Sequence, residues 1–261
     1  MTVHFQDAPV VEIGITFWIE PSAEQSDWRD LALALGEKFK EDYPHCETFY
    51  KNDLEITEKT KLGFPKKGRV IHYVRQVNFW SEYKDRLCSI GGDFFSFRVF
   101  RKENSADALH FANVSEEANK VFSRYLSEWM PQHIKQIAIS YIDDIRIPVS
   151  AESNIQLDDY LNLGVVAPFD PISFSDCELH FSLPSHGNLG GKMQVRFYRA
   201  VSEVSVFRMI LQWNCLIENI NSMEMPLIQQ GLEYGHQHCY NYFMACLTQK
   251  TKELFKPISS E

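Results

Sequence analysis

The stretch CELHFSLPSHGNLGGKMQVRF, residues 177–197, decides the fold. On both sides of its Pro- and Gly-rich middle, 184–191, apolar residues alternate with polar ones. Successive side chains of a strand point to opposite faces of a sheet, so each flank predicts a half-buried strand. The middle segment predicts a turn. The whole stretch therefore predicts an antiparallel hairpin.

The same alternation occurs in other parts of the chain. Further strands are predicted over 11–20, 70–80, 86–101, 135–147 and 204–218. Gly91-Gly92-Asp93 interrupts one of them as a tight turn or bulge. Residues 51–69 show little periodicity and predict a long loop.

Three segments carry apolar residues at helical spacing and predict amphipathic helices over 27–43, 115–130 and 223–255. Ser115 is the expected N-cap of the second helix, because a serine hydroxyl accepts a hydrogen bond from the first helical turn. A short helix is also expected at 157–162.

Antiparallel strands covered by amphipathic helices predict an α+β fold, with long strands in a curved sheet and the helices packed on it. The order of elements also allows two similar strand-hairpin-helix halves. These would be residues 1–148 and 149–261, joined in one continuous structural unit.

The composition excludes several classes of protein. In 261 residues the chain has 19 Phe, 11 Tyr and 5 Trp, which is enough to bury a large core and excludes disorder over most of its length. A net charge of −9 gives no global attraction to nucleic acid or to an anionic membrane. No apolar run reaches the roughly 20 residues that span a bilayer, and the N-terminus does not resemble a signal peptide. The six cysteines form no CxxC pair, which favours buried, reduced thiols and a cytoplasmic location.

One local basic run stands out in this acidic chain. No acidic residue separates its members, which are Lys59, Lys61, Lys66, Lys67 and Arg69. Such a run is a candidate contact surface for a nucleic-acid backbone or an acidic protein partner. The alternative is a solvated loop without a partner.

Arginines on the polar phase of the predicted strands form a second candidate site. Arg98, Arg196 and Arg208 would share one face of the sheet if their strands are neighbours, and arginine is suited to binding anions in a bidentate manner. The alternative is ordinary cross-strand pairing with Glu178 and Glu218.

Catalytic and metal-binding patterns are weak. Glu82 and Lys84 have the D/E-x-K form of metal-dependent nucleases, with Asp53 or Glu55 as a second carboxylate. The form is too short to identify a nuclease by itself.

Neither of the two remaining patterns gives a metal site. Asp143 and Asp144 would face opposite sides of their strand, and His236 and His238 would point to different faces of a helix. We therefore assign no catalytic residue, no metal ligand and no cofactor.

Several short segments resemble one known protein family. They are Val10-Val11-Glu12, Phe122 to Leu126, Ile139 to Ile145, and Leu232, His236, His238 and Phe243 before Thr248. Together they are similar to a sporadically distributed prokaryotic family without an established activity. The resemblance implies one full-length unit and supplies no catalytic residue. The patchy distribution of the family resembles that of mobile or defence-linked genes.

These observations favour a non-catalytic binding or regulatory protein that recognises a protein or nucleic-acid partner, within a bacterial antiviral-defence or mobile-element cassette. One alternative is a metal-dependent nuclease or nucleotide-processing enzyme. Another is a homo-oligomeric scaffold in which the 223–255 helix pairs across a two-fold axis. No membrane partner is expected.

Overall fold

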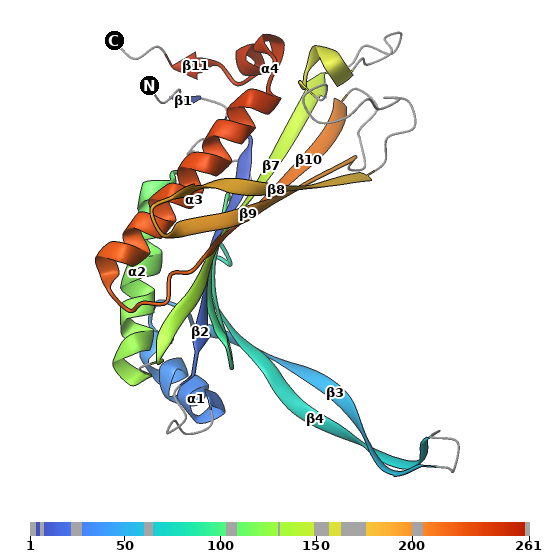
Figure 1. The fold of residues 1–261 in the computed structure, drawn as a ribbon, viewed down its shortest axis with the longest axis vertical. Coiled ribbons are helices and arrows are strands. Elements are labelled where there is room, and N and C mark those ends of the chain that lie inside the picture. The colour runs from blue at the N-terminus through green and yellow to red at the C-terminus, as the bar shows by residue number, and fades with distance from the viewer. Residues whose placement is uncertain are drawn as a thin grey trace.

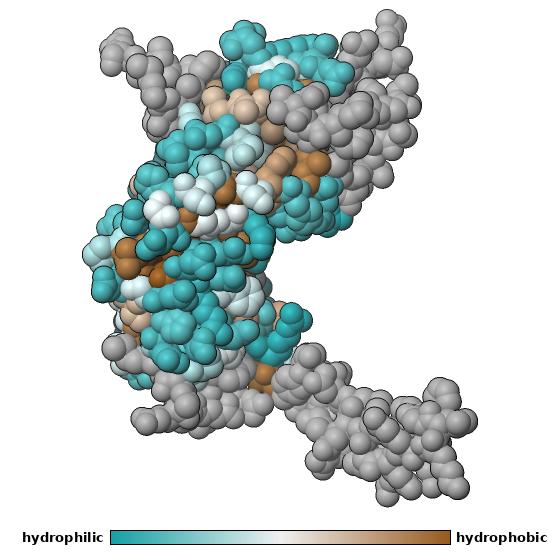
Figure 2. Space-filling view, in the orientation of Figure 1, coloured by the Kyte–Doolittle hydropathy of each residue, from teal (hydrophilic) through white to brown (hydrophobic). Residues whose placement is uncertain are grey.

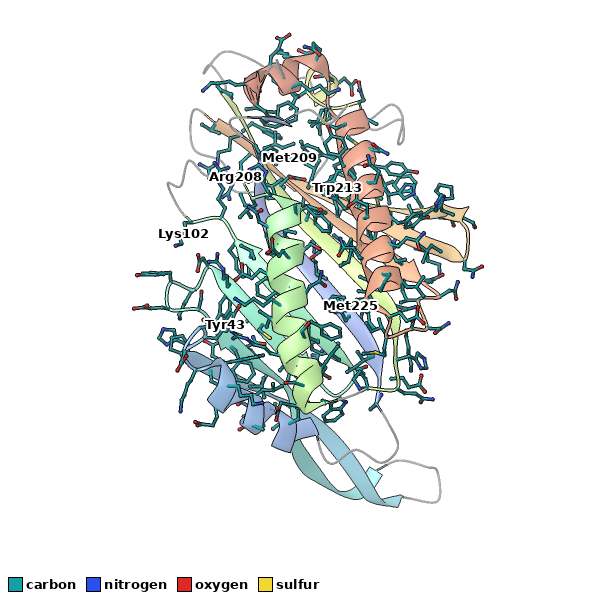
Figure 3. The ribbon with its side chains drawn as sticks, turned by 90° about the vertical axis from the view of Figure 1, so that its left-hand side faces the viewer. Tyr43, Lys102, Arg208, Met209, Trp213 and Met225 are labelled. Atoms are coloured by element: carbon teal, nitrogen blue, oxygen red, sulfur yellow. The ribbon has the colours of Figure 1, made fainter. Side chains whose placement is uncertain are left out.

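The computed structural model describes residues 4–5, 8–21, 28–59, 65–102, 109–129, 131–148, 157–162, 176–199 and 206–258. Nine antiparallel strands form one twisted sheet, and the helices lie on one of its faces (Figure 1). Figure 3 looks onto this helix-covered face, with α2 and α3 in front of the strands. A large antiparallel sheet with a few helices confirms the predicted α+β class.

The strands of the sheet are β2 (Val10–Glu20), β3 (His45–Lys59), β4 (Pro65–Trp80), β5 (Arg86–Gly91), β6 (Phe94–Phe100), β7 (His133–Pro148), β8 (Asp176–His186), β9 (Leu189–Arg199) and β10 (Val206–Glu218). The helices are α1 (Trp28–Phe39), α2 (Phe111–Glu128), α3 (Met225–Cys246) and α4 (Gln249–Leu254), with a short 3-10 turn at Leu157–Asp159. Two short strands, β1 (His4–Phe5) and β11 (Pro257–Ile258), pair with each other.

The strand order is β3-β4-β5-β6-β2-β7-β10-β9-β8. Two consecutive parts of the chain, which we call runs, share a connectivity in which the first strand pairs with the last strand and a long helix follows. In the first run, β2 pairs with β6 and the run ends in α2; in the second, β7 pairs with β10 and the run ends in α3. The two runs meet where β2 pairs with β7, at the centre of the sheet. The predicted hairpin of residues 177–197 is β8 and β9, and it is confirmed.

The core lies between the sheet and the helices. Alternate residues of β2, such as Ile13, Ile15 and Phe17, are buried toward the helices, as their period of two requires. From α2, Phe122 stacks on Phe17 with ring centroids 4.2 Å apart. Phe95 of β6 lies beside the same ring, so aromatic side chains fill the interior below α2. The outward surface of the helices is mainly hydrophilic, as expected for amphipathic helices (Figure 2).

The predicted loop over 51–69 is wrong, because most of these residues form the long hairpin of β3 and β4. The hairpin extends away from the rest of the molecule (Figure 1). A strand without a helix packed over it need not alternate apolar and polar residues, so its sequence carries no period. Cross-strand pairing runs along the whole hairpin, and the inner part of β4 also packs on a helix, where Phe79 contacts Phe39 of α1.

The ends of the helices differ from the predictions. α2 begins at Phe111 and not at Ser115, because Phe111 and Val114 extend its buried face by one turn. Ser115 is buried inside the helix, and its hydroxyl finds no partner within the described part of the chain. His110 is the N-cap.

The predicted helix over 223–255 is interrupted at Leu247, which pairs with Leu161. Asn162 donates from Nδ2 to the carbonyl oxygens of Ala245 and Leu247, at 3.0 and 3.3 Å. The hydroxyl of Thr248 then accepts from the backbone N–H of Thr251 and starts α4. The first predicted helix, over 27–43, ends earlier, at Phe39. None of the helices in the described ranges is long and apolar enough to cross a membrane.

Candidate functional site

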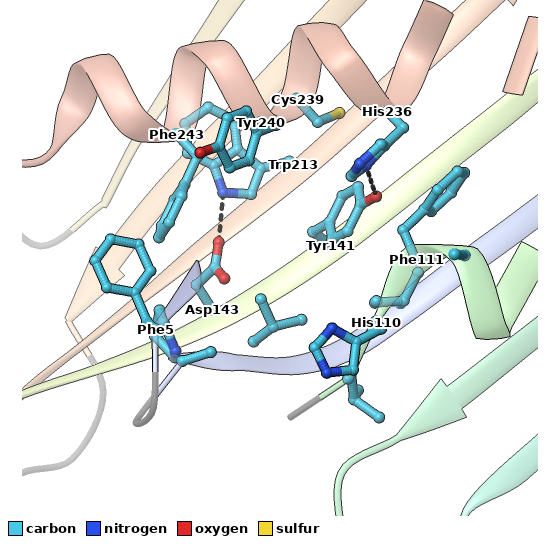
Figure 4. Close-up of a pocket in the computed structure, with 16 residues that line it drawn as sticks. Phe5, His110, Phe111, Tyr141, Asp143, Trp213, His236, Cys239, Tyr240 and Phe243 are labelled. Atoms are coloured by element: carbon cyan, nitrogen blue, oxygen red, sulfur yellow. Dashed lines mark hydrogen bonds between the residues drawn. The ribbon is translucent and has the colours of Figure 1, made fainter. Parts of the chain in front are cut away.

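A cavity of about 270 Å³ lies between the start of α2, the middle of α3 and the central strands (Figure 4). Phe5 of β1, and Ala8 and Pro9, which precede β2, also line it. Six aromatic side chains line it, and these are Phe5, Phe111, Tyr141, Trp213, Tyr240 and Phe243. The cavity is therefore predominantly apolar, as pockets for small molecules are.

The spacing of residues within each element brings the lining together. Tyr141 and Asp143 are two residues apart on β7, so both point toward the helices. Trp213 is the register partner of Tyr141 on β10 and lies on the same face. From above, α3 presents His236 and Tyr240, which are four residues apart on one side of the helix.

Asp143 is the central polar group of the cavity. Its side chain is buried, and its Oδ2 accepts a hydrogen bond of 2.7 Å from Nε1 of Trp213. No Lys or Arg occurs among the described residues that line the cavity. Burial raises the pKa of Asp143 to about 7, and the hydrogen bond from Trp213 only partly opposes this shift. The carboxyl group therefore titrates near neutral pH and not near its usual 3.8.

Tyr141 and His236 form the second polar feature. A hydrogen bond of 2.7 Å joins the tyrosine hydroxyl to Nδ1 of the histidine. The ring of His236 also stacks on Phe111, with centroids 4.2 Å apart and planes 6° from parallel. Burial lowers the pKa of His236, so its ring is neutral at pH 7. Burial likewise raises the pKa of Tyr141 well above its usual value, which keeps the phenol protonated.

A second cleft, of about 380 Å³, lies beside the β4–β5 turn and α2 and is polar. Several of its charged groups form ion pairs with one another. Arg86 donates to Glu117 from Nε at 2.7 Å and to Asp85 from Nη1 at 2.8 Å, and Lys102 lies 3.2 Å from Asp85. The ion pairs of Arg86 thus occupy two of the acidic groups that line this cleft.

The residues proposed for a nuclease are not assembled into one site. Glu82 lies in the turn after β4 and lines the second cleft. Asp53 and Glu55 pair with Ile71 and Arg69 in the outer part of the β3–β4 hairpin, far along the ladder from that turn. Within the described ranges no group of three His, Cys, Asp or Glu residues could hold a metal ion.

The basic run 59–69 lies at the end of the β3–β4 hairpin. Lys59 ends β3, and Lys66, Lys67 and Arg69 belong to β4, whereas Lys61 lies outside the described residues. The register places Lys67 opposite Glu58, and Arg69 opposite Glu55. Acidic residues just before the basic run in the sequence are thus the register partners of two of its members.

The three candidate arginines lie on the face of the sheet that carries no helix. Arg98 donates from Nη1 to Glu12 at 3.2 Å, and Arg208 donates from Nε to Asp144 at 2.7 Å. Arg196 is the register partner of Glu178 on β8, which agrees with the alternative of cross-strand pairing.

The prediction that Asp143 and Asp144 face opposite sides is confirmed. Asp143 bonds to Trp213 on the helix-covered side, and Asp144 bonds to Arg208 and Arg146 on the other side.

Comparison with known proteins gives little further information. No protein-family model matches the chain, and no curated protein matches it. Among solved structures, the crystal structure of the di-domain ARO/CYC StfQ from the steffimycin biosynthetic pathway is similar over 94% of this chain and 97% of that chain, at 7% identity and a TM-score of 0.21. A likeness this weak shows neither a shared fold nor a shared activity.

Sequence reasoning missed the cavity. Its residues come from segments far apart in the chain, and His236 was considered only for metal geometry. One signal was present. Asp143 occupies the apolar phase of β7, between Tyr141 and Ile145, where a carboxylate must be buried. A charge at a core position points to a functional site.

Proposed function

We propose that this protein is a binding protein whose cavity takes a small, mainly apolar molecule carrying a hydrogen-bond donor. The observation that carries the proposal is the buried carboxyl group of Asp143, which faces an aromatic cavity without a cationic partner among the described residues. Burying such a group is costly unless it has partners. A ligand that donates a hydrogen bond would offset that cost.

We further propose that the chain consists of two similar halves that begin at β2 and β7. The pair Ile15 and Ile139 lies at the centre of the sheet. Two residues further along each strand, Phe17 pairs with Phe95, and Tyr141 pairs with Trp213. Both pairs of aromatic residues face the helices, so these positions correspond in the two proposed halves. The second half would then begin at residue 133, before the sequence-based division at 148.

This comparison of the halves supports a cavity maintained for a ligand. Under α2 the space beside Phe17 is filled by stacked Phe122 and Tyr125. Under α3 the corresponding space beside Tyr141 is the cavity. The interior is therefore filled by side chains in one half and left open in the other. Because a cavity lowers the stability of a fold, the open space is better explained by a ligand that occupies it.

The test is a screen of small aromatic and aliphatic fragments, read out by thermal stabilisation and by intrinsic tryptophan fluorescence, to which Trp213 in the cavity wall contributes. Fragments that bind in the cavity should raise the melting temperature. In Ala8→Phe, whose added ring would fill the cavity, the same fragments should bind at least tenfold more weakly. A fragment that binds the variant equally well does not occupy the cavity. A screen without any binder would overturn the proposal.

We also propose that the protein binds a macromolecular partner, at a surface separate from the cavity. Support comes from the β3–β4 hairpin, which extends from the body and carries the basic run (Figure 1). We expect that charge reversal at Lys61, Lys66 and Lys67, each to Glu, abolishes co-purification of a partner and leaves the melting temperature unchanged. If the partner still co-purifies, the hairpin is not its contact surface.

An acid–base enzyme is the second candidate function. A carboxyl group with a pKa of about 7 is suited to accept or donate a proton at neutral pH, and Asp143 has this property. For an enzyme, bound fragments should be converted to products that mass spectrometry detects. Asp143→Asn should then abolish conversion while binding persists.

A further inference from the structure

We infer that the cavity recognises a small protonated amine attached to an apolar or aromatic body, with Asp143 as its counter-ion. The inference rests on the proposed binding function and specifies the chemical class of the ligand. It comes from the unbalanced charge of the cavity and from the nature of its walls.

Asp143 has one oxygen available for a ligand. Oδ2 is bonded to Trp213 at 2.7 Å, and this contact fixes the orientation of the carboxyl group (Figure 4). The described residues show no second hydrogen-bond partner at Oδ1, although the residue lines the cavity. An ammonium group at that position would form a charge-assisted hydrogen bond, which is stronger than one from a neutral donor.

His236 and Cys239, the titratable groups of α3 whose pKa values are shifted by burial, do not supply a positive charge. His236 from α3 is kept neutral by burial and is held by Tyr141. Cys239, also from α3, has its pKa raised well above the usual value and stays a thiol. The other titratable residues facing the cavity are Tyr240 of α3 and His110 at the start of α2, and β10 and the β1–β2 segment contribute Trp213 and apolar residues. A cationic ligand therefore meets the carboxyl group of Asp143, and none of the described residues that line the cavity is a Lys or Arg.

The walls also suit a cation. The negative faces of aromatic rings attract ammonium groups, most strongly where water is excluded. Rings of Trp213, Tyr240 and Phe243 lie close to Asp143 (Figure 4). They would contact both the charged group of an amine and its apolar body.

A ligand with a carboxylate is the opposing possibility, since the start of α2 adjoins the cavity and the N-terminus of a helix favours anions. Such a ligand could bind only with Asp143 protonated, so its affinity would fall as the pH rises. An amine would instead displace the proton of Asp143, so its affinity would rise with pH. The direction of the proton exchange thus distinguishes the two.

The experiment compares three probes that share a benzene ring and a two-carbon arm: 2-phenylethylamine, 2-phenylethanol and phenylacetate. Binding is measured by calorimetry at pH 7 in phosphate and in Tris, whose different ionisation enthalpies reveal proton exchange. We expect the amine to bind about tenfold more tightly than the alcohol and to release about half a proton. The alcohol should release almost none.

The variants Asp143→Asn and Asp144→Asn form a matched pair, because neighbouring residues of β7 face opposite sides of the sheet. Asp143→Asn keeps an oxygen for Trp213 and should remove the preference for the amine together with the proton release. Asp144→Asn should leave both unchanged. Circular dichroism checks that each variant is folded.

Three results would overturn the inference: the alcohol or phenylacetate binding as tightly as the amine, an unchanged affinity of Asp143→Asn for the amine, or proton uptake with the amine. The fragment screen keeps the proposed function separate from this inference. If only neutral fragments bind in the cavity, the binding function stands and recognition of an amine does not.

Discussion

At the scale of single residues, burial of Asp143 costs stability but places a carboxyl group where it can bind a ligand. It occupies a core position of β7, between residues whose side chains pack against α3. Only one hydrogen bond from a described residue, that of Trp213, compensates its burial. A hydrophobic residue at this position would be buried at a lower cost in free energy. The carboxyl group is therefore better explained by a role in binding than by a contribution to stability.

The same residue makes stability depend on pH. Its pKa rises from the usual 3.8 to about 7 on folding, so the folded protein retains a proton that the unfolded chain has lost. Well below pH 4 both states are protonated, and ionisation of the carboxyl group costs no stability. Between pH 4 and 7 stability is progressively lost, and above pH 7 the loss is complete. The difference of about three pKa units corresponds to at most about 4 kcal/mol.

We therefore expect Asp143→Asn to be more stable than the natural protein at pH 8 and close to equal at pH 4. Urea denaturation at both pH values measures the difference in the free energy of unfolding. Asp144→Asn should instead be less stable than the natural protein at pH 8, because Arg208 and Arg146 lose their carboxylate partner. Equal stability of Asp143→Asn and the natural protein across this pH range would show that Asp143 is ionised in the fold.

At the scale of elements, the sequence predicted those strands and helices that bury one face. Alternation located β2, β7 and β10, because each packs its apolar side against helices. The β3–β4 hairpin was predicted only in part. The strand expected over 70–80 is confirmed in β4, whereas residues 51–59 and 65–69 show little periodicity and nevertheless pair as strands. Helix ends also escaped prediction, because side chains distant in the sequence set them, as Asn162 does for α3.

Strands β9 and β10 approach each other closely at Gly191, so a side chain at this position should destabilise the protein. A Cβ atom at Gly191 would lie 2.3 Å from the carbonyl oxygen of Leu216, which is backbone and cannot rotate away. We expect Gly191→Ala to separate the two strands and to destabilise the protein by about 1–3 kcal/mol. Urea denaturation measures the loss.

The neighbouring Gly190 offers the control. No atom lies within 4 Å of a Cβ built there, on the same strand. Gly190→Ala should change stability by less than about 0.5 kcal/mol. Similar losses for both variants would mean that the alanine side chain, and not its contact with β10, causes the effect.

At the scale of the whole molecule, the pairing of β2 with β7 joins the two runs of strands into one sheet. Hydrogen-bonded register extends over most of both strands, from Val10 with Asp143 to Glu20 with His133. Neither run can therefore lose its first strand without exposing the core of the other. The sequence allowed two halves but could not show this junction, because its partners are more than a hundred residues apart.

We accordingly expect urea unfolding to occur in a single transition, with tryptophan fluorescence and far-ultraviolet circular dichroism giving the same midpoint. Tryptophans in both runs, such as Trp18 and Trp213, make the fluorescence sensitive to each. Two separate midpoints would show that one run remains folded while the other is lost.

The strand order leaves β3 and β8 at the two ends of the sheet, each paired on one side only within the described ranges. A long edge exposes a row of amide and carbonyl groups to which a strand of another molecule can add, the first step of aggregation. In β3 the ladder changes register between Phe49 and Tyr50, and again between Ile56 and Glu58. Such bulges twist an edge out of the flat geometry that addition requires. A sequence that removed them would present a straight edge of 15 residues to every neighbouring copy.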